Sequence, residues 1–412
     1  MKEYTLLEVE GIVKDELSTS LEGLLRQGAR KMLQSALETE VSEYIARCQN
    51  ELDEQGHRQV VRNGFHKPRK LTTGIGKVPI RQPRVQDRRK DQTFTSAILP
   101  KYARRAPSID TLIPTLYLKG ISTSSFPEAL EAILGKDAPG LSSANIVRLK
   151  AIWDEERKGW DKRDLSDKHY VYFWVDGIYF NVRLEPDRPC LLVIIGATAD
   201  GKKELVAISD GHRESKLSWQ TVLSDLKSRG LKNAPAVAVG DGALGFWAAL
   251  EEEFSTTKHQ RCWVHKTANV LDKLPKKLQK DAKGLLHQMY LSATKDDALS
   301  VYDRFLNLYQ DKYPKACECL EKDKEVLFTF YDFPAIHWLH LRTTNPIEST
   351  FATVRHRTRQ TKGCGSRNAT LSMVYKLAIE AQKTWLRLRG YRMVQLVLQG
   401  VKFVDGEILK AA

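Results

Sequence analysis

Apolar and polar positions change their spacing several times along the chain, and each change predicts a different kind of element. Residues 18–50 carry apolar side chains at helical spacing, which predicts one or two helices. Helical spacing returns in three short pieces, separated by Gly and Pro, over residues 108–118, 125–134 and 142–153. Three short helices of this kind favour a helix-turn-helix module, although a plain helical bundle fits the same pattern.

A different pattern begins at Tyr170. Apolar runs of strand length predict strands in the next stretch of the chain: 170–175, 179–184, 190–199, 205–209 and 236–239. Helical spacing predicts helices over 218–229, from about 244, over 276–340 and over 345–391, with a strand–helix unit at 259–274. Antiparallel strands followed by alternating strands and helices predict a mixed α/β domain.

Positive charge is concentrated in two segments of this chain of 412 residues, whose formal net charge is +14. Residues 58–105 hold fourteen Lys/Arg against two Asp, and residues 341–412 hold thirteen Lys/Arg against four Asp/Glu. Such segments favour phosphate binding through counterion release, so nucleic acid is the first candidate partner. A solvated basic linker is the alternative interpretation of residues 58–105.

The composition argues against membrane and secreted classes. No apolar run approaches the roughly 18 residues of a membrane span, and several acidic residues near the N-terminus do not suit a secretory signal peptide. Six scattered cysteines are too few for a disulfide framework. We therefore expect a cytoplasmic protein without a membrane partner.

Two Asp-Gly pairs follow buried apolar runs. Asp176 follows YVYFWV and Asp241 follows APAVAVG, so each is expected at a strand end or tight turn. Carboxylates at the ends of buried strands converge at one edge of a sheet, where α/β folds place active sites, although each pair alone is also explained as a turn. Asp200 is interpreted as a hairpin turn. Asp210 also follows an apolar strand and is the main rival for a metal-binding role.

Glu348 falls in the first turn of a helix predicted to begin near Asn345. Its carboxylate has two interpretations. It either closes a capping box or, with Ala352, Arg355 and Arg359 along one stripe, presents a metal ligand beside phosphate-binding groups.

Cys262 and His265 form a Cys-x2-His pair, which is half of a zinc site. The next cysteines, Cys317 and Cys319, lie more than 50 residues away, so the spacing disfavours zinc. No hydrolase signature surrounds the pair, which also disfavours a cysteine nucleophile.

Four sequence blocks together resemble the Mutator-type transposases of bacterial insertion sequences. They are WVDGIYFNVR, VGDGALGFWAAL, QRCWVHKTANVLDKLP and TTNPIESTFATVRHRTRQTKGCGS. The resemblance implies that Asp176, Asp241 and Glu348 are the DDE triad of an RNase H-like core. It also implies a helical insertion before Glu348, and a structural or DNA-positioning role for Cys262 and His265.

The resemblance also implies DNA contacts. Arg355 matches the basic position that would contact DNA near the scissile phosphate. The other DNA-binding candidates come from the two basic segments: Arg359, Lys362, Arg62, Lys67, Arg69, Lys70, Arg81 and Arg84.

A metal-dependent mechanism follows from the three acids. Carboxylates without a neutralising neighbour repel one another, and two Mg2+ ions, for which Mn2+ substitutes, relieve the repulsion. The ions would activate water for strand nicking and then the freed 3′-hydroxyl for attack on target DNA. The expected partners are double-stranded DNA, as terminal inverted repeats and as target, and a second copy of the chain in a homodimer. The expected location is the cytoplasm of a bacterium, at the nucleoid.

The expected fold is an α/β RNase H-like catalytic core with a helical insertion, preceded by a mainly helical DNA-binding region. The first three expected divisions are a helical region (1–57), a basic DNA-contacting segment (58–105) and a helix-turn-helix-like domain (106–165). The catalytic core is expected in two segments, 166–275 and 341–412, of which the second includes the C-terminal helices, and the insertion (276–340) separates them. Two alternatives remain: a catalytically idle DNA-binding regulator or relic, and an RNase H-like nuclease without strand transfer.

Overall fold

The computed structural model describes residues 21–90, 92–106, 109, 116, 143–179, 190–211, 213–242, 244–360 and 366–409. The chain divides into two compact units, Met1–Leu149 and Lys150–Ala412. Most of the segment expected to form the helix-turn-helix lies outside the described residues. Its third helix is present as α5 (Ser143–Asp161), which is longer than expected.

The first unit combines one long helix with short antiparallel strands. The helix is α2 (Leu21–Arg47), and the strands are β1 (Val60–Phe65), β2 (Arg69–Thr73), β3 (Gly76–Ile80) and β4 (Pro83–Asp87). β1 pairs with β4, and β2 pairs with β3. The strands lie within the basic segment expected at 58–105, between the parts expected to be helical, and runs such as KVPI alternate there between core and surface.

The basic segment is folded onto α2. Leu37 of α2 packs with Leu71, Val78, Ile80 and Leu99 in one apolar cluster. The linker interpretation therefore does not describe the strand-forming portion of this segment.

The second unit is built around a five-stranded sheet in the order β7-β6-β5-β8-β9. The strands are β5 (Tyr170–Tyr179), β6 (Cys190–Thr198), β7 (Lys203–Gly211), β8 (Val237–Gly240) and β9 (Lys258–Arg261). β5, β6 and β7 are antiparallel neighbours, whereas β8 is parallel to both β5 and β9. The mixed α/β architecture expected from the sequence is confirmed.

One strand differs from its prediction. The expected break at Asp176-Gly177 is absent, because β5 continues to Tyr179 and Gly177 pairs with Leu192 of β6. Asp241, in contrast, directly follows β8, and Gly242 turns the chain there with φ of 89°.

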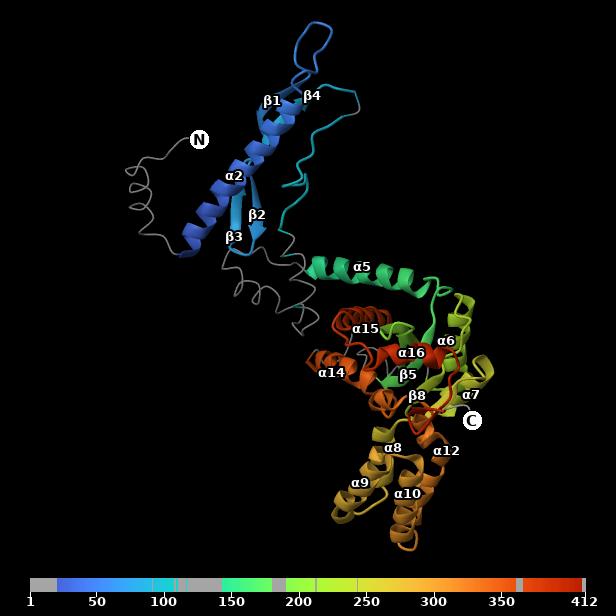
Figure 1. Ribbon diagram of the computed structural model, residues 1–412. Helices are drawn as coiled ribbons and strands as arrows, with labels where there is room; N and C mark the ends of the chain where they lie inside the picture. The colour runs from blue at the N-terminus through green and yellow to red at the C-terminus, as the bar shows by residue number, and fades with distance from the viewer. Residues whose placement is uncertain are drawn as a thin grey trace. The chain divides into compact units, whose positions relative to one another are not determined.

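Helices cover both faces of the sheet (Figure 1). α6 (Lys216–Ser228) and α7 (Leu244–Glu253) pack on one face, where Trp219 and Phe246 join Phe173 and Val175 in the core. On the other face, the Trp174 indole N–H donates to the His340 carbonyl at 2.7 Å, and the Tyr172 hydroxyl bonds to His337 Nδ1 at 2.7 Å. That face is covered by α13 (Trp338–Leu341), α14 (Asn345–Gln360) and α15 (Arg367–Gln382).

A helical segment lies between the sheet and α14, as expected for residues 276–340. It contains α8 (Trp263–Leu271), α9 (Lys276–Leu291), α10 (Lys295–Tyr309), α11 (Pro314–Glu321), α12 (Lys324–Leu327), η2 (Thr329–Asp332) and η3 (Ala335–His337). α9 and α10 lie side by side and extend away from the sheet (Figure 1). The chain continues with η4 (Tyr391–Met393), α16 (Val394–Leu398), β10 (Phe403–Val404) and β11 (Glu407–Ile408).

Buried polar groups join this helical segment to the sheet. The Asp323 carboxylate lies 3.0 Å from Arg261 Nε and 2.5 Å from Lys266 Nζ. The Gln260 side chain donates to the Leu327 carbonyl at 3.0 Å and accepts from the Phe330 N–H at 2.7 Å. Since Gln260, Arg261 and Lys266 are buried, their pairing fixes the helical segment against β9 and α8. Within the described residues of the chain, no helix has both the length and the apolar character needed to cross a membrane.

Candidate active site

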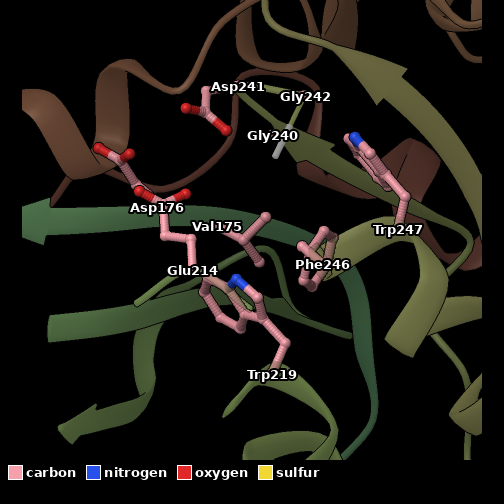
Figure 2. A pocket seen from close by; sticks show the side chains of 9 residues that line it. All are labelled: Val175, Asp176, Glu214, Trp219, Gly240, Asp241, Gly242, Phe246 and Trp247. Atoms are coloured by element: carbon pink, nitrogen blue, oxygen red, sulfur yellow. The ribbon is translucent and has the colours of Figure 1, made fainter. Parts of the chain in front are cut away.

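Asp176 and Asp241 lie side by side at one edge of the sheet. β5 and β8 run parallel, and Trp174 is opposite Val239. Two residues further along both strands, the same register brings Asp176 beside Asp241. Both side chains line one pocket (Figure 2), so the expected convergence of the two strands' aspartates occurs.

A third carboxylate, which the sequence analysis missed, lies in the same pocket. Glu214 comes from the connection between β7 and α6, and Figure 2 shows its side chain reaching toward Asp176. Burial raises the pKa of Glu214 to about 7, with further contributions from Asp241 and Asp176. The carboxylates in this pocket therefore repel one another. In the sequence, Glu214 is recognisable only as the residue before Ser215, the N-cap of α6. A Glu at the start of a helix is common and does not by itself indicate a site.

Glu348 lies in the first turn of α14, as expected, but it does not close a capping box. Its Oε1 accepts a hydrogen bond from the Thr344 hydroxyl at 3.2 Å and lies 3.8 Å from His265 Nε2. In a capping box, Glu348 would accept from the backbone N–H of Asn345, three residues earlier, but this N–H donates to the Thr343 hydroxyl oxygen at 3.4 Å. The backbone N–H of Thr344 donates to Cys262 Sγ at 3.4 Å. The carboxylate is thus directed toward the Cys-His pair.

Cys262, His265 and Glu348 form a compact cluster. One ligand atom from each lies within 4.8 Å of the others. Cys262 precedes α8 and is fully buried. Its backbone N–H donates to the Gly240 carbonyl at 2.8 Å, at the end of β8. The Cys-His pair is therefore next to Asp241 in the fold.

The charges of the Cys-His pair are coupled. Burial raises the pKa of the Cys262 thiol, but its interactions with His265 and Thr344 outweigh burial and lower the pKa overall. The interaction with Cys262 raises the pKa of His265 to about 9, and Asp176 and Asp241 add to this shift. A protonated His265 consequently lies within electrostatic reach of both aspartates and Glu348.

The donor atoms determine which cations these groups suit. Asp176, Asp241 and Glu214 offer only carboxylate oxygens, which are the ligands that Mg2+ and Mn2+ prefer. The Cys262–His265–Glu348 cluster mixes sulfur, nitrogen and oxygen and supplies three ligands among the described residues, one fewer than a structural zinc site needs.

Asp210, the rival acid, is located elsewhere. It lies on β7, two strands away from β5, and its carboxylate is 3.5 Å from Arg367 Nη1. The pocket that it lines also contains Arg157 and Arg229 and does not include Asp176 or Asp241.

The basic residues of the first unit differ in their surroundings. Five are exposed: Arg62, Lys67, Lys70, Arg81 and Arg84. Arg69 is half-buried and donates to the carbonyls of Lys101 at 2.7 Å and Pro100 at 3.1 Å. The guanidinium groups of Arg62 and Arg81 lie over the Phe65 ring, at 5.0 and 5.1 Å. Lys362 and the side chains of Arg355 and Arg359 lie outside the described residues.

These surroundings separate a DNA-contacting role from a structural one. If Arg81 contacts a DNA phosphate, as the sequence analysis expects, we expect Arg81→Gln to weaken binding to DNA of any sequence. The slope of log affinity against log salt should fall by about 0.9, the effect of losing one phosphate contact. We expect Arg69→Gln to lower the melting temperature instead, because the carbonyls lose their donor. Fluorescence anisotropy over a salt series, with thermal melts of both variants, measures the two effects. An unchanged salt slope for Arg81→Gln would contradict the DNA-contact assignment.

Comparison with known proteins decides the family. The sequence model described as "Transposase, Mutator family" matches residues 1–388. The chain belongs to this family. It is therefore a transposase, an enzyme that acts on DNA.

The relatives of this Mutator-family transposase come from several bacteria. It is 50% identical over 73% of its length to the transposase for insertion sequence element IS6120 of Mycolicibacterium smegmatis, covering 92% of that protein. It is 51% identical over 68% of its length to the transposase for element IST2 of Acidithiobacillus ferrooxidans, covering 94% of that protein. The match to a solved structure, the Drosophila P element transposase strand transfer complex, covers 70% of this chain and 84% of that chain. The sequence identity is 12%, and the TM-score is 0.28. A TM-score this low says nothing about a shared fold.

Proposed function

We propose that this transposase cuts DNA at the ends of an insertion sequence and joins them to target DNA, with Asp176, Asp241 and Glu348 as its metal-binding acids. One observation carries the proposal: Asp176 on β5 and Asp241 directly after the parallel strand β8 line one pocket. His265 lies close to Glu348, the third acid, and is affected by the two aspartates. Its Nε2 is 3.8 Å from Glu348 Oε1, and the charges of Asp176 and Asp241 contribute to its raised pKa.

The proposal includes an RNase H-like core. It is supported by a sheet of three antiparallel strands followed by two parallel ones, with helices on both faces. In this interpretation the helical segment from α9 to α13 is an insertion that separates Asp241 from Glu348 in sequence.

The donor set fits hard divalent cations, and Mg2+ is the proposed cofactor, with Mn2+ as a substitute. Two such ions, when bound, would supply an activated hydroxyl nucleophile and stabilise the leaving oxygen of an in-line displacement at phosphorus. The chain's own role is to hold the acids on rigid elements. Asp176 and Asp241 are fixed by paired strands, and Glu348 by the first turn of α14 with its hydrogen bond from Thr344.

The proposed substrates are the terminal inverted repeats of the element and a double-stranded target. The exposed basic residues of the first unit, together with Arg355 and its neighbours on α14, would bind backbone phosphates. Two element ends must be brought together for joining, so we propose that the protein acts as a homodimer on DNA.

A cleavage assay tests the proposal. Purified protein and Mg2+ are incubated with a plasmid that carries the gene and its native flanking DNA, and new 3′-hydroxyl ends are mapped. We expect the wild type to nick at inverted repeats and Glu348→Gln to lose this activity while it still binds the ends. Glu318→Gln, the same change at an exposed position of α11, serves as the matched control and should cut normally.

The outcomes separate the alternatives. Normal cutting by Glu348→Gln would reject the assignment of Glu348. Specific binding of the flanks without cutting by any protein would favour a DNA-binding relic, and nicking without joining to target would favour a nuclease.

A further inference from the structure

We propose that Glu214 is a fourth carboxylate ligand of the metal site formed by Asp176 and Asp241. The inference rests on the proposed function, because it assigns a further residue to the same site. The motif resemblance covers Asp176, Asp241 and Glu348 and does not include Glu214.

The backbone that carries Glu214 is held rigidly. Ser215 caps α6, and its side chain accepts a hydrogen bond from the Ser218 N–H at 3.2 Å. The first turn of α7 packs directly on this connection: a Cβ on Gly245 would lie 2.4 Å from the Glu214 carbonyl oxygen and 2.6 Å from the Lys216 nitrogen. Since such contacts are not tolerated, only glycine at 245 allows this approach. Two helices thus fix the position from which the Glu214 side chain extends.

β5 has a glycine, Gly177, where the Glu214 side chain approaches the strand. A Cβ on Gly177 would lie 2.2 Å from Glu214 Cδ and 2.3 Å from Oε1. Gly177 lies inside β5, where glycine weakens a strand, and the turn that first explained it is absent. Close approach of the Glu214 carboxylate, directly beside Asp176, accounts for a glycine at this position.

Charge also favours a fourth acid. Glu214, Asp176 and Asp241 line one pocket (Figure 2). The Glu348 carboxylate lies 3.8 Å from His265 Nε2. Each carboxylate in the pocket offsets one positive charge of the bound divalent cations. A half-buried carboxylate facing two others is unfavourable in the metal-free protein and becomes favourable when cations are bound.

The test measures metal binding without DNA cleavage. Mn2+ is titrated into the full-length wild type, Glu214→Gln, Asp241→Asn and Glu318→Gln, by calorimetry and by the rise in melting temperature that binding produces. We expect Glu214→Gln to weaken Mn2+ binding at least tenfold while its melting temperature without metal does not fall. Glu318→Gln should bind as the wild type does.

Gly177→Ala provides an independent variant, since its new methyl group displaces the Glu214 carboxylate without changing any charge. We expect it to weaken Mn2+ binding in the same direction. The double variant Gly177→Ala/Glu214→Gln should bind no more weakly than the weaker-binding single variant, because both changes remove the same ligand.

The results separate this inference from the proposed function. Wild-type affinity in Glu214→Gln, with binding lost in Asp241→Asn, would overturn the role of Glu214 and leave the metal-binding triad in place. No Mn2+ response in the wild type would overturn both.

Discussion

Asp241→Asn is expected to lower DNA cleavage by about a thousandfold or more while the protein remains folded. Asp241 directly follows β8 and lies beside Asp176, so a neutral amide there removes one of the proposed metal ligands. Loss of several kcal/mol of transition-state stabilisation corresponds to at least this factor, since each 1.36 kcal/mol is tenfold. Single-turnover cleavage of a labelled element end, at saturating Mg2+, measures the effect.

Asp210→Asn is the matched control for this prediction. Asp210 also belongs to an Asp-Gly pair, at the end of β7, but it pairs with Arg367 and lines another pocket. We expect its cleavage rate to stay within a few-fold of the wild type. A large loss of cleavage in Asp210→Asn together with normal cleavage in Asp241→Asn would reverse the assignment of the two aspartates.

Asp323→Ala is expected to destabilise the second unit by about 3 kcal/mol. The Asp323 carboxylate pairs with Arg261 and Lys266, whose side chains are only 6% and 3% exposed. Burial raises the pKa of Asp323, but Lys266 and Arg261 outweigh burial and lower it overall, so the charged carboxylate is favoured. Its removal leaves two buried cations without their partner, a change that costs about 3–5 kcal/mol in proteins. Because Asp323 itself is 20% exposed, we expect the lower end of that range.

Asp332→Ala is the control for burial. Asp332 pairs with Lys258 at 2.7 Å, but these side chains are 39% and 52% exposed, and surface pairs contribute about 0–1 kcal/mol. Urea unfolding of the wild type, Asp323→Ala and Asp332→Ala compares the contributions of the two ion pairs to stability. Equal stability of the two variants would show that the Asp323 contacts do not attach the helical segment to the sheet.

The sequence allowed the sheet and two of its acids to be predicted because their signals are local. Apolar runs of strand length mark β5, β6 and β8, and the chain direction places Asp176 and Asp241 at one edge. The helical segment before α14 was also predicted correctly, since its apolar residues keep helical spacing over many turns.

The remaining features depend on contacts between distant residues. Asp176-Gly177 looks like a turn locally, and only the pairing with β6 keeps β5 extended through it. Glu214 looks like an ordinary residue before a helix, and only the packing of α7 and β5 brings it to Asp176. The position of the Glu348 carboxylate also depends on a distant contact, because His265, whose Nε2 lies 3.8 Å from Glu348 Oε1, is far from it in the sequence.

The order of the chain also has a consequence during synthesis. The five strands are complete once Arg261 has been made, whereas Glu348 follows α8 and the whole helical segment. Ribosomes add roughly 5–20 residues per second, so several seconds pass between the synthesis of Arg261 and that of Glu348. Until η3 and α13 emerge, Tyr172 and Trp174 on one face of the sheet lack their hydrogen-bond partners His337 and His340. The segment that completes the core therefore also carries Glu348, one of the proposed metal ligands. If the proposal holds, a nascent or prematurely terminated chain would lack this ligand and would not cut DNA.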